Sequence, residues 1–171
     1  AFCNAGFDLM GVKSQFSSLS FFADHAAVNI IVMALIVTGG IGFMTWDDIK
    51  THKHRLRKYR MQSKVILVTT ALLIALPALY FFFFEFGNET AGNRILLSLF
   101  QAITPRTAGF NTADLTKIGQ VGTVIIILLM LVGGSSGSTA GGVKTTTLAV
   151  LFSTAISVFR RREHTNFFGR R

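Results

Sequence analysis

Two short segments of the chain could supply backbone oxygen ligands to a cation. Phe2-Cys3-Asn4-Ala5-Gly6-Phe7-Asp8 and Arg106-Thr107-Ala108-Gly109-Phe110-Asn111 share Ala-Gly-Phe followed by a short polar side chain, and their glycines are 103 residues apart. A cation that leaves water needs replacement oxygens, and backbone carbonyls provide them where glycine lets the chain approach the ion. An isolated glycine of this kind usually makes a tight turn, so it is the duplication that favours an ion path.

The surroundings of the two segments are also alike. Each is followed by a polar connection and then by an apolar stretch with a glycine pair, Gly39-Gly40 in one case and Gly133-Gly134 in the other. Asp8 and Asn111 come directly after the loops and could attract cations, although such residues more often face solvent or cap a helix. The predicted unit is a membrane helix, a half-helix, a glycine-containing loop and a second membrane helix, and repeats of this kind are common in transporters.

A third segment, GGSSGSTAGGVKTTT, is rich in small residues. It is not a phosphate-binding loop, because Val143 separates Gly142 from Lys144 where that motif needs Gly-Lys. We interpret it as a flexible break in an apolar helix that acts as a gate; close helix packing without gating is the alternative. The expected gate residues are Gly133, Gly134, Ser135, Ser136, Gly137, Ser138, Thr139, Ala140, Gly141, Gly142 and Lys144. Lys144 is ionisable in an apolar context, so we expect it to help set the closed position.

Composition places these segments in a membrane protein. The 171 residues are 50% hydrophobic and 15% charged, with a net charge of +9, whereas soluble domains carry roughly 25% charged residues. The 17 Phe residues and a mean hydropathy of +0.52 argue against a nucleic-acid binder. A single cysteine, Cys3, excludes an intrachain disulfide and a four-cysteine zinc site. No arrangement of nucleophile, base and acid stands out, so we expect no enzyme.

Three stretches are apolar enough to cross a bilayer, which takes about 20 helical residues. They are Ala26 to Met44, Val65 to Phe86 with an expected kink at Pro77, and Val121 to Phe159, which is broken in its middle. The halves of the third are each too short to cross alone, so we expect one discontinuous helix. Ala91 to Ile103 is also too short and is expected to be a re-entrant half-helix.

Positive charge indicates the orientation. The segments from Lys50 to Lys64 and from Arg160 to Arg171 hold 12 of the 17 cations, so both are expected to be cytoplasmic. Gly87 to Gln120 is then external, with Arg94, Arg106 and Lys117 as its sparse cations. Orientation alone accounts for the basic clusters, and contact with lipid or a partner is an added role. Because the chain begins with Ala1, we expect a fragment of a larger unit.

The combination of NAGFD, TPRTAGFN and GGSSGSTAGGVKTTT resembles the potassium-translocating subunits of the Trk/Ktr/HKT superfamily. The resemblance implies an all-α membrane protein of repeated units similar to potassium-channel subunits, with one discontinuous inner helix. Residues 1–46 then form the filter loop and inner helix of repeat 2, and 47–64 a cytoplasmic loop. Residues 65–159 form repeat 3, with outer helix 65–86, pore helix 91–103, filter 104–111 and inner helix 121–159 broken at 133–144, and residues 160–171 form a second cytoplasmic segment.

The same resemblance implies a function and partners. It indicates uptake of K⁺, or alternatively Na⁺, across the cell membrane by a multi-pass protein without an organic cofactor. The implied filter residues are Asn4, Ala5, Gly6, Phe7, Thr107, Ala108, Gly109 and Phe110. Implied partners are a second copy in a homodimer, a cytosolic nucleotide-binding regulatory ring and membrane lipid, but no nucleic acid. The alternative is a membrane scaffold or permease subunit with no ion path of its own.

Overall fold

The computed structural model describes residues 1–7, 18–53 and 55–161. Asp8, which the sequence analysis named, lies outside this described part, as do residue 54 and residues 162–171 of its two basic segments. Within it the regular structure is helical, apart from one isolated bridge between Val132 and Val143. This confirms the predicted all-α class. The helices are α1 (Ala26–Ile41), α2 (Phe43–His52), α3 (Met61–Tyr80), α4 (Ala91–Ile103), α5 (Gln120–Leu131) and α6 (Thr145–Phe159).

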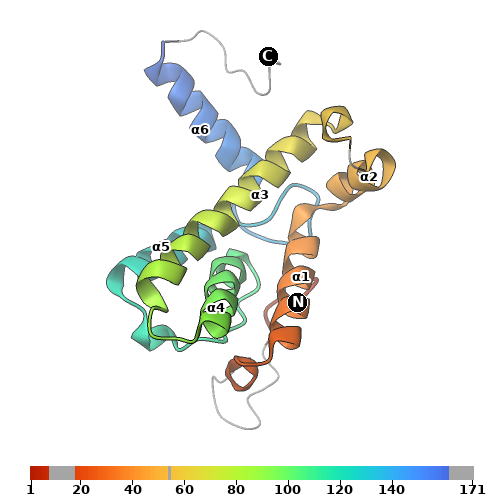
Figure 1. Cartoon of the computed structure of the whole chain (residues 1–171). Helices are drawn as coiled ribbons and strands as arrows, with labels where there is room; N and C mark the ends of the chain where they lie inside the picture. The colour runs from red at the N-terminus through yellow and green to blue at the C-terminus, as the bar shows by residue number, and fades with distance from the viewer. Residues whose placement is uncertain (8–17, 54, 162–171) are drawn as a thin grey trace.

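Helix α3 is the long central element, with α4 and α6 packed against it (Figure 1). Pro77 lies inside α3 without ending it, and the helix passes into a π-helical turn at Phe81–Glu85. Proline has no N–H group to donate to the helical hydrogen-bond ladder, so Pro77 accounts for the change from α-helix to π-helix close to it. Together these residues form one apolar helix, Met61–Glu85, of 25 residues.

Helix α4 covers the residues expected for the half-helix. Its buried face includes Leu97, Phe100 and Ile103, and it packs against both α1 and α3. Phe100 and Ile103 join the core cluster, whose other buried members are Leu19, Met33, Ile36 and Ala108. A single 3₁₀ turn, Thr104–Arg106, follows α4 and contains Pro105, which cannot continue the helical ladder.

Helix α1 is shorter than expected. The sequence predicts a span to Met44, but α1 ends at Ile41, and α2 leaves it at an angle of 97°. Gly42 lies at the bend with φ +91°, a conformation that side-chain-bearing residues rarely adopt. The bend turns the chain away from the direction of α1 and sends α2 to the side (Figure 1).

The discontinuous helix consists of α5 and α6, joined by residues 132–144. The bridge between Val132 and Val143 closes the neck of this connection, which we call the inner loop. The N-terminus of α5 is fixed by Glu85 at the end of the α3 helix, since the Gly119 N–H donates to its carboxylate at 3.0 Å. A carboxylate is favourable there because the first N–H groups of a helix carry partial positive charge.

By length and composition, one helix, Met61–Glu85, could cross a membrane, and the bent pair α1 and α2 could supply a second. Helices α5 and α6 are apolar but shorter. Large apolar side chains are exposed along α3, α5 and α6, among them Leu72, Leu76, Ile127, Leu128, Leu151 and Phe152. Such a surface suits lipid or further protein rather than water.

Candidate functional site

The two Ala-Gly-Phe loops, 103 residues apart in the sequence, lie against each other. A Cβ atom added to Gly6 would come within 2.3 Å of the Ala108 carbonyl oxygen. No side chain fits at that distance, so glycine is required by the close approach as well as by its φ of +69°. The fold therefore brings together the two segments that the sequence analysis paired.

The backbones of the two loops also match. Gly6 and Gly109 have φ +69° and +76°. The residues two positions earlier, Asn4 and Thr107, are non-glycine residues that also have positive φ, +51° and +132°. Because positive φ is uncommon outside glycine, the same pattern in both loops supports a true internal repeat.

The end of α4 holds the second of these loops. The N–H groups of Ala108 and Gly109 both donate to the Thr104 carbonyl, at 3.1 and 3.0 Å. The Thr104 hydroxyl in turn donates to the Phe110 carbonyl at 2.5 Å. The loop is thus folded back over the C-terminal end of a helix, where the helix dipole favours positive charge.

Asn111 has a structural role after this loop. Its N–H donates to the Ser18 hydroxyl at 3.0 Å, and its carbonyl accepts from the Leu19 N–H at 2.8 Å. It ties the end of one loop to the chain that leads into α1.

The inner loop docks on the bend between α1 and α2. The Ser135 N–H donates to the Gly40 carbonyl at 3.0 Å, and the Phe43 N–H donates to the Gly137 carbonyl at 3.1 Å. A Cβ atom on Gly42 would lie 2.6 Å from the Ser135 hydroxyl oxygen. The bend and the loop are therefore fitted to each other, and neither could take its present form with a larger residue at Gly42.

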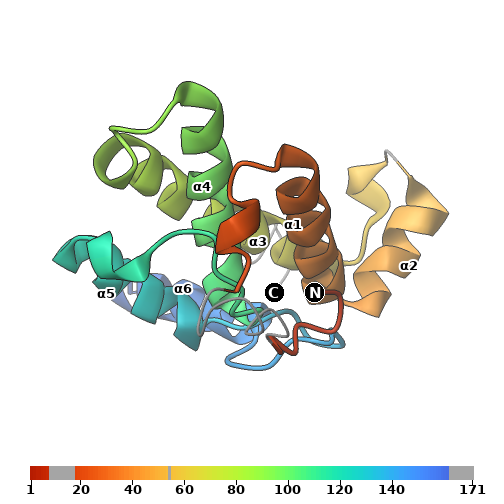
Figure 2. The ribbon, with the colours of Figure 1, turned by 90° about the horizontal axis from the view of Figure 1, so that it is seen from below.

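The inner loop also reaches the N-terminal segment. The Thr139 hydroxyl donates to the Phe2 carbonyl at 2.9 Å and lies 3.2 Å from the Gly39 carbonyl. Figure 2 shows the N-terminal segment of the chain beside this loop. Within the loop, the half-buried Lys144 donates from Nζ to the Ala140 carbonyl at 2.7 Å. The inner loop is thus in contact with α1, with the bend and with the N-terminal segment.

Arg106 is buried, which the sequence analysis did not anticipate. It was counted there among the sparse cations of the segment from Gly87 to Gln120, and its exposed fraction is 8%. It lies between α4 and the Thr107–Phe110 loop, and one of its terminal nitrogens donates to the Gly133 carbonyl at 3.4 Å. No carboxylate of the described residues pairs with it, and its Nε has no hydrogen-bond partner there. Burial is favoured because Arg106 directly follows an apolar helix and Pro105, which was the signal available in the sequence.

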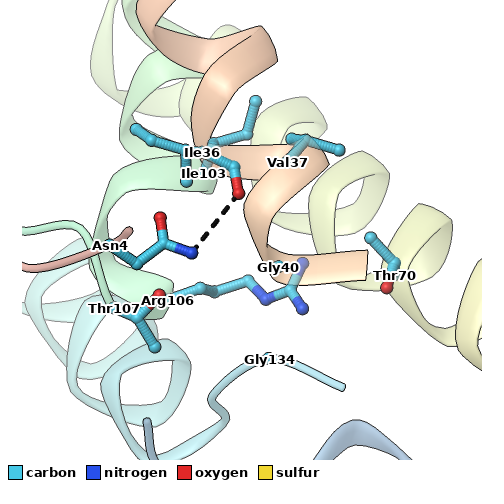
Figure 3. Close-up of a pocket in the computed structure, with 9 residues that line it drawn as sticks. All are labelled: Asn4, Ile36, Val37, Gly40, Thr70, Ile103, Arg106, Thr107 and Gly134. Carbon is cyan, nitrogen blue, oxygen red and sulfur yellow. Dashed lines mark hydrogen bonds between the residues drawn. The ribbon is translucent and has the colours of Figure 1, made fainter. Parts of the chain in front are cut away.

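Arg106 lines a small cavity at the junction of all these elements (Figure 3). The cavity has a volume of about 20 Å³, which suits one water molecule. The lining residues are Asn4, Ile36, Val37, Gly40, Thr70, Ile103, Arg106, Thr107 and Gly134. The side-chain oxygens of Asn4 and Thr70 are buried without a protein partner. The cavity therefore touches both Ala-Gly-Phe loops, α1, α3 and the inner loop.

The described residues contain no group of three His, Cys, Asp or Glu side chains placed to hold a metal ion. Gly109 is exposed, and nothing lies within 4 Å of a Cβ atom added to it.

Comparison with known proteins agrees with this geometry. Residues 1–170 match the TrkH family, described as cation transport protein. The chain is 40% identical over 177 residues to the potassium/sodium uptake protein NtpJ of Enterococcus hirae, covering 99% of this chain and 38% of that protein. It is 35% identical to the Ktr system potassium uptake protein B of Bacillus subtilis, with the same coverage of 99% and 38%.

The fold is similar to the crystal structure of the potassium transporter TrkH from Vibrio parahaemolyticus. The TM-score is 0.74 at 20% identity, covering 94% of this chain and 34% of that one.

The chain belongs to the TrkH family of cation transport proteins. This confirms the resemblance drawn from the three motifs, and the relatives are transport proteins rather than enzymes, as expected. The chain spans about 38% of the length of the curated relatives it matches.

Proposed function

We propose that the full-length protein containing this chain takes up K⁺ through a pore. In this proposal, carbonyls of Asn4 to Phe7 and Thr107 to Phe110 form two strands of a selectivity filter. The observation that carries it is the close approach of Gly6 to the Ala108 carbonyl, made by two loops with the same backbone pattern. The names of the relatives support K⁺ as the cargo, with Na⁺ as a second ion because one relative is named for both.

The inner loop, Gly133 to Lys144, is the proposed gate. It is held by hydrogen bonds to Gly40 and Phe43 at the bend and to Phe2 just before the first filter loop. Hydrogen bonds of this kind contribute only about 0.5–1.5 kcal/mol each. A loop held by a few of them can be released at a modest cost, which a gate requires.

We also propose the placement of the chain and its partners. The protein is a multi-pass protein of the cell membrane, with residues 47–64 and 160–171 on the cytoplasmic side and 87–120 mainly external. The exposed apolar faces of α3, α5 and α6 support contact with lipid and with further repeats. The word "system" in the names of the Ktr relatives supports additional subunits, for which we propose a second copy of the protein and a cytosolic nucleotide-binding ring.

The test is K⁺ and Na⁺ flux through the full-length protein in liposomes, with Gly109→Ser compared against Gly92→Ser. Both sites leave open space around an added side chain, but only Gly109 has positive φ. A side chain there is strained by roughly 1–2 kcal/mol and shifts the neighbouring carbonyls. We expect Gly109→Ser to lose K⁺ flux or selectivity while Gly92→Ser behaves as the parent.

Equal flux in the two variants would show that the Ala-Gly-Phe loops are only turns. Absence of flux in the parent itself, in a folded protein, would favour the scaffold or permease-subunit alternative instead.

A further inference from the structure

A basic recess lies where α2 ends. It has a volume of about 360 Å³ and is lined by Thr51, His52, Lys53, Arg55 and Lys58. It is separate from the loops of the proposed ion path, which meet at the other end of α2. The recess has room for a phosphate group together with several waters, each of which occupies about 30 Å³ in the liquid.

The charge in this recess is not neutralised by the described protein. Lys53, Arg55 and Lys58 contribute three positive charges, and no carboxylate lines the recess. The two nearby acids, Asp47 and Asp48, both pair with Arg60 instead. A concave site with several cations and no counter-charge selects an anion, and Arg is suited to phosphate because its planar fork can donate two parallel hydrogen bonds.

Hydrogen bonds hold the backbone on the two sides of the recess. Helix α2 ends at His52, and Lys53 follows it with φ +45°. The Tyr59 hydroxyl donates to the Lys53 carbonyl at 2.5 Å. The Ser63 hydroxyl and the Arg60 N–H both donate to Asp48, at 2.6 and 3.0 Å. These bonds tie the end of α2 to the start of α3, and restraint of this kind lowers the entropy lost on binding.

Apolar side chains on the same helix indicate what kind of phosphate is bound. Phe43, Met44 and Trp46 are 62%, 58% and 38% exposed. Phe43, Trp46 and Lys50 are spaced by three and four residues, so one exposed face of α2 changes from aromatic to cationic along its length. Aromatic and basic residues on one helix beside a membrane span are typical of the boundary between acyl chains and headgroups.

We propose that this recess binds the phosphate of an anionic phospholipid in the cytoplasmic leaflet, with the exposed apolar residues of α2 in contact with the acyl region. The proposal rests on the membrane placement given above and is independent of which ion is transported. Thr51 and His52 add neutral donors beside the three cations. A basic segment next to a membrane helix is attracted to anionic lipid by roughly 1 kcal/mol per cation. The concave form of the recess adds a fit to the phosphate group.

The test uses the full-length protein, purified and placed in phosphatidylcholine bilayers with or without phosphatidylglycerol. Retained phosphatidylglycerol is counted by native mass spectrometry. The variant is the pair Arg55→Gln and Lys58→Gln, and the matched control is Arg160→Gln and Arg161→Gln, which removes the same charge from another exposed basic segment. We expect binding on the order of thirtyfold weaker in the first pair, since each cation near an anionic surface contributes roughly a fivefold preference. The control pair should leave the recess-bound lipid in place.

Three results would overturn the proposal. Equal loss of lipid in both pairs would mean that the cations act only through general attraction. Displacement of the lipid by inorganic phosphate or ATP at low concentration, or their binding in phosphatidylcholine alone, would assign the recess to a soluble phosphate. Binding of a cytosolic protein that depends on Arg55 and Lys58 in phosphatidylcholine alone would make it a protein surface. K⁺ flux in all of these samples reports on the proposed function separately.

Discussion

Replacing Arg106 by methionine should loosen the gate without damaging the fold. Arg106 is 8% exposed and has no acidic partner among the described residues. A buried charge without a partner is costly, so an apolar residue of similar length in its place should not destabilise the fold. The free energy of unfolding should therefore be unchanged or higher in Arg106→Met.

The lost interaction is the hydrogen bond from Arg106 to the Gly133 carbonyl, at 3.4 Å. A charged donor contributes roughly 1.5–3 kcal/mol, and the long distance places this bond at the lower end. About 1.4 kcal/mol corresponds to a tenfold change in an equilibrium. We therefore expect the proportion of released inner loop, and with it the basal K⁺ flux, to rise about tenfold.

The assay is basal K⁺ flux of the full-length protein reconstituted alone, with chemical denaturation as the measure of stability. Arg94→Met is the matched control, because Arg94 lies on the same helix but donates to the Phe82 carbonyl at 2.6 Å, away from the inner loop. Unchanged flux in Arg106→Met would refute the link between Arg106 and the gate. A loss of stability of several kcal/mol would refute the account of an unpaired charge and reveal a carboxylate partner elsewhere in the full-length protein.

Three further outcomes follow from the same contacts. Gly42→Ala should raise basal flux and lower the free energy of unfolding by roughly 1–3 kcal/mol, because the φ of Gly42 is +91° and an added Cβ would meet Ser135. The control is Gly40→Ala, where an added Cβ has only one contact, at 3.9 Å. Thermal denaturation should show that this control is as stable as the parent or more so. A hydrogen bond from the Ser63 hydroxyl holds the pKa of Asp48 below its usual range, so its contribution to stability is present above about pH 4 and is lost as pH falls through the lowered pKa. Asp48→Asn should remove that part of the acid dependence in denaturation curves, and an unaltered pH profile would contradict it. Lys144→Met should raise basal flux severalfold by removing a charged bond within the inner loop, and unchanged flux would remove Lys144 from the gate.

Much of the architecture was predictable because long apolar runs in the sequence indicate membrane helices. The half-helix expected over Ala91 to Ile103 corresponds to α4, which has the same limits. Apolar content sets its start after a polar connection, and Pro105 sets its end. The break in the third apolar stretch was also predictable, because a run of glycine and serine residues has a low propensity to form helix.

The bend at Gly42 was not predictable from local pattern. The segment from Ala26 to Met44 is mostly apolar along its whole length, and a glycine within it costs too little to end a helix by itself. The bend exists because the inner loop, about 95 residues further along, supplies hydrogen bonds to Gly40 and Phe43. Pairings over such separations leave no periodic signal in a single sequence.

The burial of Arg106 was not predictable from counts of charge. Orientation rules concern the Lys and Arg residues of a whole segment and not the burial of one side chain. The pairing of the two Ala-Gly-Phe loops was predictable from their shared residues, but the approach of Gly6 to Ala108 required coordinates.

The docking of the inner loop also sets an order of assembly during synthesis. Its hydrogen bonds join Thr139 to Phe2 and Ser135 to Gly40, pairs separated by 137 and 95 residues. Chains are made from the N-terminus, and contacts between distant residues must wait for both partners. The first Ala-Gly-Phe loop and the bend must therefore remain without these hydrogen bonds while α3, α4 and α5 are synthesised. The contacts can form only once the chain has been made as far as the start of α6.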